Sequence, residues 1–167
     1  LGPYTVAQSA KNEFPNKKIK VVDYFTRIPN FFEYIKNFAS SETQYICIST
    51  TFIQNVFNEN IADFNMWKTS HDELCDWFEN LKRVAPNAEI VLGGHACDVY
   101  FRSYCKHPNG RTLPKALTKY VDHVFHGYGE DIFVDFLHDR VLPEHTFERD
   151  QIKFYSDDKK PGKGTQC

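Results

Sequence analysis

Short apolar runs alternate with amphipathic segments along most of this chain, and this alternation limits the folds open to it. One run, residues 44–49, has almost no polar interruption, which is typical of a strand in a parallel sheet buried on both faces. The strand-like runs are residues 18–24, 44–49, 88–92 and 121–126, and the helix-like segments are residues 4–13, 29–39, 70–85 and 130–140. The sequence therefore predicts an α/β, doubly wound, flavodoxin- or Rossmann-like fold with a mostly parallel sheet and helices on both faces.

The segment of residues 70–85 carries the clearest helix signal. Ser70 and Glu73 have the spacing of a capping box, in which each side chain bonds the other residue's backbone amide. Apolar residues recur at helical spacing and form one stripe, which consists of Leu74, Trp77, Phe78, Leu81 and Val84. Because Pro86 and Asn87 end this pattern, we expect a helix of about four turns that packs one face on the sheet.

Composition argues against two classes of partner. The chain has 167 residues, 41% of them hydrophobic, and its 20 basic and 22 acidic residues give a net charge of −2. A chain of this kind can bury its own core, but it offers no broad basic face for nucleic acid and no basic patch for a membrane. The five cysteines are odd in number and irregularly spaced, without a C-x-x-C. This usage favours a reducing, cytoplasmic location over a disulfide framework.

We expect one domain over residues 1–142 and a linker or tail over residues 143–167. The tail ends in DDKKPGKGTQC, whose charges, Pro and Gly are typical of a linker. Two stretches inside the domain, residues 52–69 and 102–118, exceed the usual length of a loop. Long ordered loops in compact domains often serve function.

The candidate site residues follow three of the predicted strands. Ligands of open α/β sheets bind outside the carboxyl ends of the strands, where small side chains let them reach backbone amides. We name these segments the Ser-Thr-Thr end (Ser49, Thr50, Thr51), the Gly-Gly end (Gly93 and Gly94, followed by His95) and the Gly-Tyr-Gly-Glu turn (Gly127, Tyr128, Gly129, Glu130). Each segment alone could be a simple turn or helix cap. Their occurrence at successive strand ends favours a ligand site.

Five segments in fixed order carry a resemblance to a known family. They are LGPYTVAQSAKNEF, KIKVVDYF, YICISTTF, LKRVAPNAEIVLGGHA and VDHVFHGYGED, from residue 1 to about residue 140. The series resembles the cobalamin-binding domain at the N-terminus of B12-type radical SAM enzymes. That family has a Gly-Pro-led first helix, a strand ending in Ser-x-x, a strand ending in Gly-Gly and a Gly-x-Gly-Glu turn.

The resemblance implies a function and a role for each strand end. Cobalamin would be the small-molecule cofactor, and a downstream radical SAM domain of the same chain would be the partner that performs methyl transfer or related radical chemistry. The Ser-Thr-Thr end would lie along the buried nucleotide tail of cobalamin, and the Gly-Gly end would let this tail pass close to the sheet. The Gly-Tyr-Gly-Glu turn would contact the nucleotide base or the corrin side chains.

The sequence also departs from this family pattern. It contains no Asp-x-His-x-x-Gly motif, whose His ligates cobalt in many cobalamin domains, and the family's first strand would precede residue 1. The C-x-x-x-C-x-x-C triad that holds an iron–sulfur cluster is absent. An iron–sulfur cluster and S-adenosylmethionine would therefore belong to the downstream domain, and we expect this chain to catalyse nothing alone.

Two alternatives remain open at the level of sequence. The first is a degenerate domain of the same fold that has lost the cofactor and serves as an interaction or substrate-positioning module. The second is a flavodoxin-like domain for another nucleotide, although no G-x-G-x-x-G follows a strand.

The seven histidines show no spacing typical of a zinc site. His123 and His126 are three residues apart on a predicted strand, so their side chains should point to opposite faces. The sequence therefore predicts no structural metal site.

Overall fold

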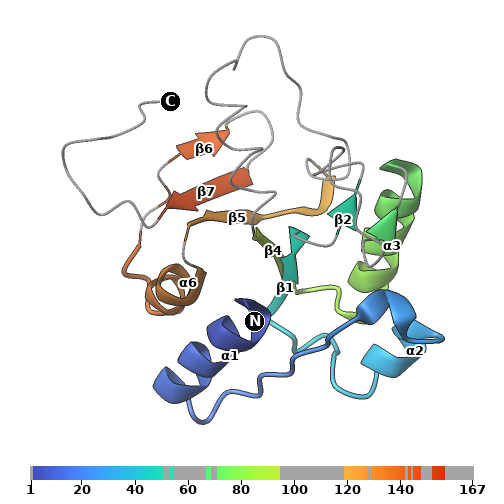
Figure 1. The fold of residues 1–167 in the computed structure, drawn as a ribbon, viewed down its shortest axis with the longest axis horizontal. Coiled ribbons are helices and arrows are strands. Elements are labelled where there is room, and N and C mark those ends of the chain that lie inside the picture. Colours follow the sequence, from blue (N-terminus) through green and yellow to red (C-terminus); the bar gives the residue numbers. More distant parts are fainter. Residues whose placement is uncertain are drawn as a thin grey trace.

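A computed structural model gives the fold of most of the chain (Figure 1). It describes residues 2–50, 53–54, 67–68, 71–94, 119–127, 129–141, 143, 145–147 and 152–156. Among these residues, no helix has the length and apolar character needed to cross a membrane.

A five-stranded sheet forms the centre of the fold, and its strand order is β1-β4-β5-β7-β6. The pairs β1–β4, β4–β5 and β5–β7 are parallel, and β6 pairs antiparallel with β7 at one edge. The strands are β1 (Tyr45–Ser49), β4 (Glu89–Gly93), β5 (His123–His126), β6 (His145–Phe147) and β7 (Ile152–Ser156). A separate parallel pair is formed by β2 (Ile53–Gln54) and β3 (Trp67–Lys68).

Helices cover both faces of this sheet, which confirms the predicted doubly wound α/β fold. One face carries α2 (Phe31–Ile35) and α3 (His71–Val84), and the other carries α1 (Gly2–Glu13) and α6 (Gly129–Leu137). The predicted stripe explains how α3 packs, because Leu74, Phe78 and Leu81 are buried while the intervening acids face solvent. Ser70 of the expected capping box lies outside the described residues.

Each face has its own apolar core. The α2/α3 face joins Ile48 of β1 to Ile90 and Leu92 of β4 and to Phe154 of β7, beneath the α3 stripe. The α1/α6 face is smaller and consists of Ala10, Val91, Phe125, Ile132, Phe133 and Tyr155. Alternate residues of β4 and β7 thus enter opposite cores, as the period of a strand requires.

The predicted strand over residues 18–24 is not formed. Residues 18–23 pair with no strand among the described residues, and a 3₁₀ turn, η1 (Phe25–Arg27), follows. Tyr24 before this turn has a left-handed backbone, with φ 48°. The β-branched residues there have the propensity for a strand, but a strand also needs a neighbour to bond, and none of the described residues supplies one.

The expectation of a linker or tail over residues 143–167 is also wrong for part of that range. Ile152–Ser156 forms β7, which lies between β5 and β6 inside the sheet. Ile152, Phe154 and Tyr155 are all buried. The charged residues that flank this segment have the composition of a linker, but the apolar run IKFYS between them completes the sheet beyond β5.

Candidate functional site

The candidate site residues that the structure describes lie along the carboxyl edge of three neighbouring strands. Ser49 ends β1 and is directly paired in register with Gly93, which ends β4. Gly127 follows the end of β5, the next strand across. Because all three strands are parallel, their ends meet at one edge of the sheet. The fold therefore brings the three sequence segments together.

Thr50 links two of these ends. Its side chain is fully buried, and its hydroxyl donates a hydrogen bond of 2.9 Å to the backbone carbonyl of Gly93. This bond satisfies a carbonyl at the end of β4 and fixes the chain that leaves β1. Thr50 therefore fixes the backbone between the ends of β1 and β4. Its hydroxyl proton already forms a hydrogen bond within the protein.

The glycines of the site have different physical roles. A Cβ at Gly93 would meet no atom of the described residues within 4 Å, so these residues leave room beside the end of β4. Gly94 and Gly127 have φ values of 100° and 95°, a backbone region that other residues rarely adopt. Gly93 thus leaves room, whereas Gly94 and Gly127 permit the turns that follow β4 and β5.

The first turn of α6 closes one side of this edge. Gly129 begins the helix, and a Cβ there would lie 3.4 Å from Cγ2 of Val6 in α1. Glu130 and Asp131 follow in the first turn. Their carboxylates stabilise the positive end of the helix dipole. They also place negative charge near the site, which disfavours a ligand with several phosphates.

Three predicted site residues lie outside the described part of the chain. They are Thr51, His95 and Tyr128. Within the described residues, no three side chains of the metal-ligating types gather in one place.

A polar chain, which was not predicted from the sequence, spans three strands on the α1/α6 face, and it is buried at His123 and Tyr155 but exposed at Glu89. His123 of β5 is 3% exposed, and its Nε2 lies 2.5 Å from Oε2 of Glu89 at the start of β4. The hydroxyl of Tyr155 in β7 lies 3.2 Å from Nδ1 of His123. In this geometry the Tyr155 hydroxyl can donate to Nδ1 while Nε2–H of the ring donates to Glu89. The sequence signal that could have indicated this chain is His123, a polar residue inside the strand-like run VDHVF.

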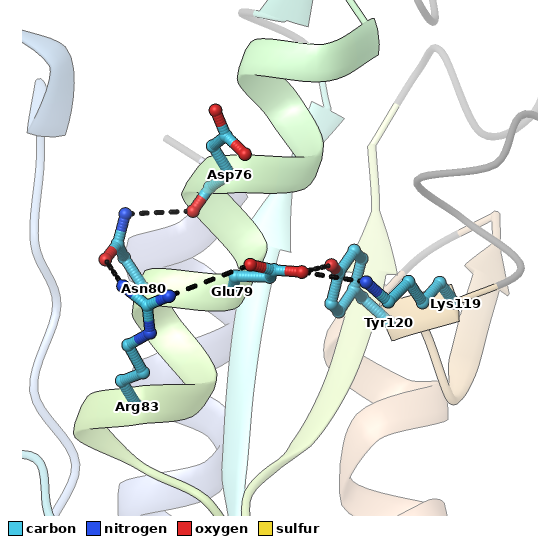
Figure 2. A network of polar contacts seen from close by, with 6 residues as sticks. All are labelled: Asp76, Glu79, Asn80, Arg83, Lys119 and Tyr120. Atoms are coloured by element: carbon cyan, nitrogen blue, oxygen red, sulfur yellow. Dashed lines mark hydrogen bonds and ion pairs between the residues drawn. The ribbon is translucent and has the colours of Figure 1, made fainter.

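A second polar network lies on the surface of α3 (Figure 2). Glu79 accepts hydrogen bonds from Lys119 at 2.7 Å and from the hydroxyl of Tyr120 at 2.6 Å. Arg83 approaches the same carboxylate at 3.8 Å. The network ties α3 to the segment that enters β5. It lies on the helix surface, and one oxygen of its carboxylate accepts both hydrogen bonds.

The chain was compared with models of protein families, with curated proteins and with solved structures, and none of them matches it.

Proposed function

We propose that this chain is a cobalamin-binding accessory module of a larger radical SAM enzyme. The observation that carries the proposal is the alignment of Ser49, Gly93 and Gly127 along one carboxyl edge, with room that the described residues leave beside Gly93. A nucleotide tail could lie in this space and meet backbone atoms at the ends of β1 and β4. The resemblance of the sequence to B12-type radical SAM enzymes supports the choice of cobalamin.

The chemistry of these residues fits the tail of cobalamin better than a nucleoside triphosphate. Small residues allow close contact with an extended chain of amide and phosphodiester groups. The acids Glu130 and Asp131 at the start of α6 oppose a ligand of high negative charge. A cobalamin tail carries one phosphodiester, so it suffers much less from this repulsion.

In this proposal the chain holds the cofactor and the radical chemistry occurs in another domain. Ser49 and the backbone near Gly93 would hold the nucleotide tail, and the turn at Gly127 would border the corrin ring. Cobalamin, when bound, supplies a cobalt centre that can carry a methyl group. The residues of this chain would position that centre toward the downstream domain.

The second candidate is a module of the same fold that binds no cofactor. The bond from Thr50 to Gly93 favours it, because this hydroxyl proton serves the sheet and is not offered to a ligand. Such a module would act by contact with another domain or with a substrate.

The test is a titration of the natural polypeptide with hydroxocobalamin, followed by calorimetry and visible spectroscopy. We expect saturable binding with a Kd of about 1 μM or lower, which corresponds to roughly 8 kcal/mol. Gly93→Leu should weaken binding at least about tenfold, because its side chain would enter the open space beside β4. This position is preferable to Gly94, where a positive φ would strain any side chain.

A matched control is Gly2→Leu. A Cβ at Gly2 would also meet no atom within 4 Å among the described residues, but Gly2 is an exposed residue in the first turn of α1 and belongs to none of the three strand-end segments. This variant should bind hydroxocobalamin as the unaltered protein does. Absence of saturable binding at about 100 μM hydroxocobalamin would reject the proposal and leave the cofactor-free module.

A further inference from the structure

We propose that a groove between α1 and residues 19–21 is a docking site for an acidic segment of a partner protein, which inserts one aromatic side chain into it. We name this feature the α1 groove. None of its lining residues belongs to the three strand-end segments. The inference therefore goes beyond the proposed function and does not depend on cobalamin.

The α1 groove has two walls of different kinds. Residues 19–21 form one wall, and the other is a stripe at helical spacing on α1, which consists of Tyr4, Ala7, Gln8 and Lys11. Within this stripe Ala7 is buried, whereas the side chain of Tyr4 is 53% exposed. The groove thus has an enclosed floor and an open rim.

The size of the groove limits what it can hold. Pockets that enclose a whole drug-sized ligand or cofactor measure roughly 300–1,000 Å³, whereas the α1 groove measures about 240 Å³. This volume suits one large side chain of a docked segment. Tyr4, Ile19 and Val21 give such a side chain apolar and aromatic neighbours. Aromatic anchors in pockets of this kind provide much of the affinity at protein interfaces.

Unbalanced positive charge surrounds the groove. Residues 11–22 contain four lysines and one acid, in a protein whose net charge is −2. The acid is Glu13, which bonds His138 at 2.8 Å. Lys11 and Lys20 line the groove and are exposed, and among the described residues neither pairs with a carboxylate. Acidic side chains of a partner would therefore complement the charge of this surface.

An aromatic ring helps to position Lys20. Its Nζ lies 5.7 Å from the ring centroid of Phe38, whose side chain is 41% exposed. Phe38 packs edge-on against Tyr34, with 5.3 Å between the ring centroids. An ammonium has three donors, and a contact with the face of a ring leaves donors available for a carboxylate. The exposed rings also extend the apolar surface beyond Lys20.

These features favour a peptide segment over the other occupants of a basic surface. Nucleic acids and anionic membranes are bound by broad arrays of cations, whereas two lysines line this groove. A segment with one aromatic side chain between acidic residues matches both the volume of the groove and the charge of its rim.

The test measures binding of a fluorescein-labelled peptide, with one tryptophan between runs of glutamate, by fluorescence anisotropy. We expect a Kd of about 10–100 μM, because the contact is small. Replacement of the tryptophan by alanine, or of the glutamates by glutamine, should weaken binding at least about tenfold. A rise in ionic strength from about 0.05 M to about 0.5 M should weaken binding of the glutamate peptide, because salt screens exposed charges.

Lys20→Glu tests the role of charge. It reverses the charge at the rim, and we expect it to bind the peptide at least about fivefold more weakly. Lys153→Glu is the matched control, because Lys153 of β7 is also exposed but does not line the groove. It makes the same change in net charge and should bind the peptide as the unaltered protein does. Unfolding in urea should give the same midpoint for both variants and the unaltered protein.

Tyr4→Ala tests the aromatic wall. Because this side chain is largely exposed, its removal should leave the fold intact and weaken peptide binding at least about fivefold. Tyr4→Phe keeps the ring and should bind the peptide as the unaltered protein does.

Binding that requires the tryptophan, the glutamates, Lys20 and Tyr4 would support the inference. Absence of saturable binding at about 1 mM peptide would overturn it, and so would equal losses in Lys20→Glu and Lys153→Glu. Capture by vesicles of phosphatidylcholine and phosphatidylserine, without binding of the peptide, would overturn it in favour of a membrane surface. Hydroxocobalamin is absent from these measurements, so their failure would leave the proposed function untouched.

Discussion

The two faces of the sheet each carry a tyrosine hydroxyl in a polar network, but only one of these hydroxyls has an enclosed partner. Beneath α6, the hydroxyl of Tyr155 meets His123, whose side chain is 4% exposed. Beside α3, the hydroxyl of Tyr120 meets Glu79, whose side chain is 39% exposed (Figure 2). The bonds on the exposed side are at least as short as the Tyr155 bond. Distance alone therefore does not rank the two networks.

Burial decides how much each network contributes to stability. A polar group that loses its partner inside the protein cannot turn to water and retains the full cost of desolvation. A carboxylate at the surface is solvated in either case, and salt screens its ion pairs. We therefore expect the buried bond between Tyr155 and His123 to matter more for stability than the network around Glu79.

The largest effect should come from His123→Phe. This change keeps an aromatic ring next to Phe136 but removes the acceptor for the buried hydroxyl of Tyr155, and we expect a loss of about 2 kcal/mol in the free energy of unfolding by urea. Adding Tyr155→Phe should restore at least half of this loss, because both partners are then apolar. A double variant less stable than His123→Phe would show that the hydroxyl is not left unsatisfied.

Tyr155→Phe should have an intermediate effect that depends on pH. Burial, and then the charges of Glu89 and Tyr45, raise the pKa of Tyr155 from 10.0 to about 12. A raised pKa favours the neutral phenol in the folded state, so this contribution is complete below pH 10 and is lost as the pH rises through 12. At pH 7 we expect the variant to be less stable by about 1 kcal/mol, because Nδ1 of His123 loses its donor.

Urea unfolding between pH 7 and pH 12 checks this prediction. The two stability curves should converge above pH 10, where only the unaltered protein bears the cost of keeping the phenol protonated. Tyr4→Phe makes the same change at an exposed position and should follow the unaltered protein throughout. Parallel curves for Tyr155→Phe up to pH 12 would contradict the enclosed environment.

Glu79→Gln should have the smallest effect. Hydrogen bonds from Lys119 and Tyr120 lower the pKa of Glu79 from 4.5 to about 2. The folded-state pKa is depressed, so the contribution is present above pH 4.5 and disappears as the pH falls toward 2. Because water screens this site, we expect a change in Tm of no more than about 2 °C at pH 7, and none at pH 2.

Thermal unfolding across this pH range measures the difference. Glu33→Gln is a suitable control, since it removes an exposed ion pair with Lys36 within one helix segment and touches no tyrosine. If Glu79→Gln lowered stability as much as His123→Phe, solvent exposure would not explain a difference in stability contribution between the two networks.

The sequence by itself determined the elements whose signals are local. The stripe from Leu74 to Leu81 specifies which face of α3 is buried, and the apolar runs at β1, β4 and β5 specify strands in a doubly wound sheet. Helical and strand periods depend on residues a few positions apart, so they can be read without knowledge of the partner. The sequence also indicated the turn at the Gly-Gly end, because Gly94 has a positive φ, which favours glycine over other residues.

Only the tertiary structure decided which strand-like segments pair with a neighbouring strand. Residues 18–22 and Ile152–Ser156 both have the composition of strands, but among the described residues only the second segment has a neighbour to bond and becomes β7. Likewise, nothing near His123 in sequence indicates Glu89 or Tyr155, which come from strands 34 and 32 residues away. A strand and a polar chain both depend on groups distant in sequence, and only the fold brings those groups within bonding distance.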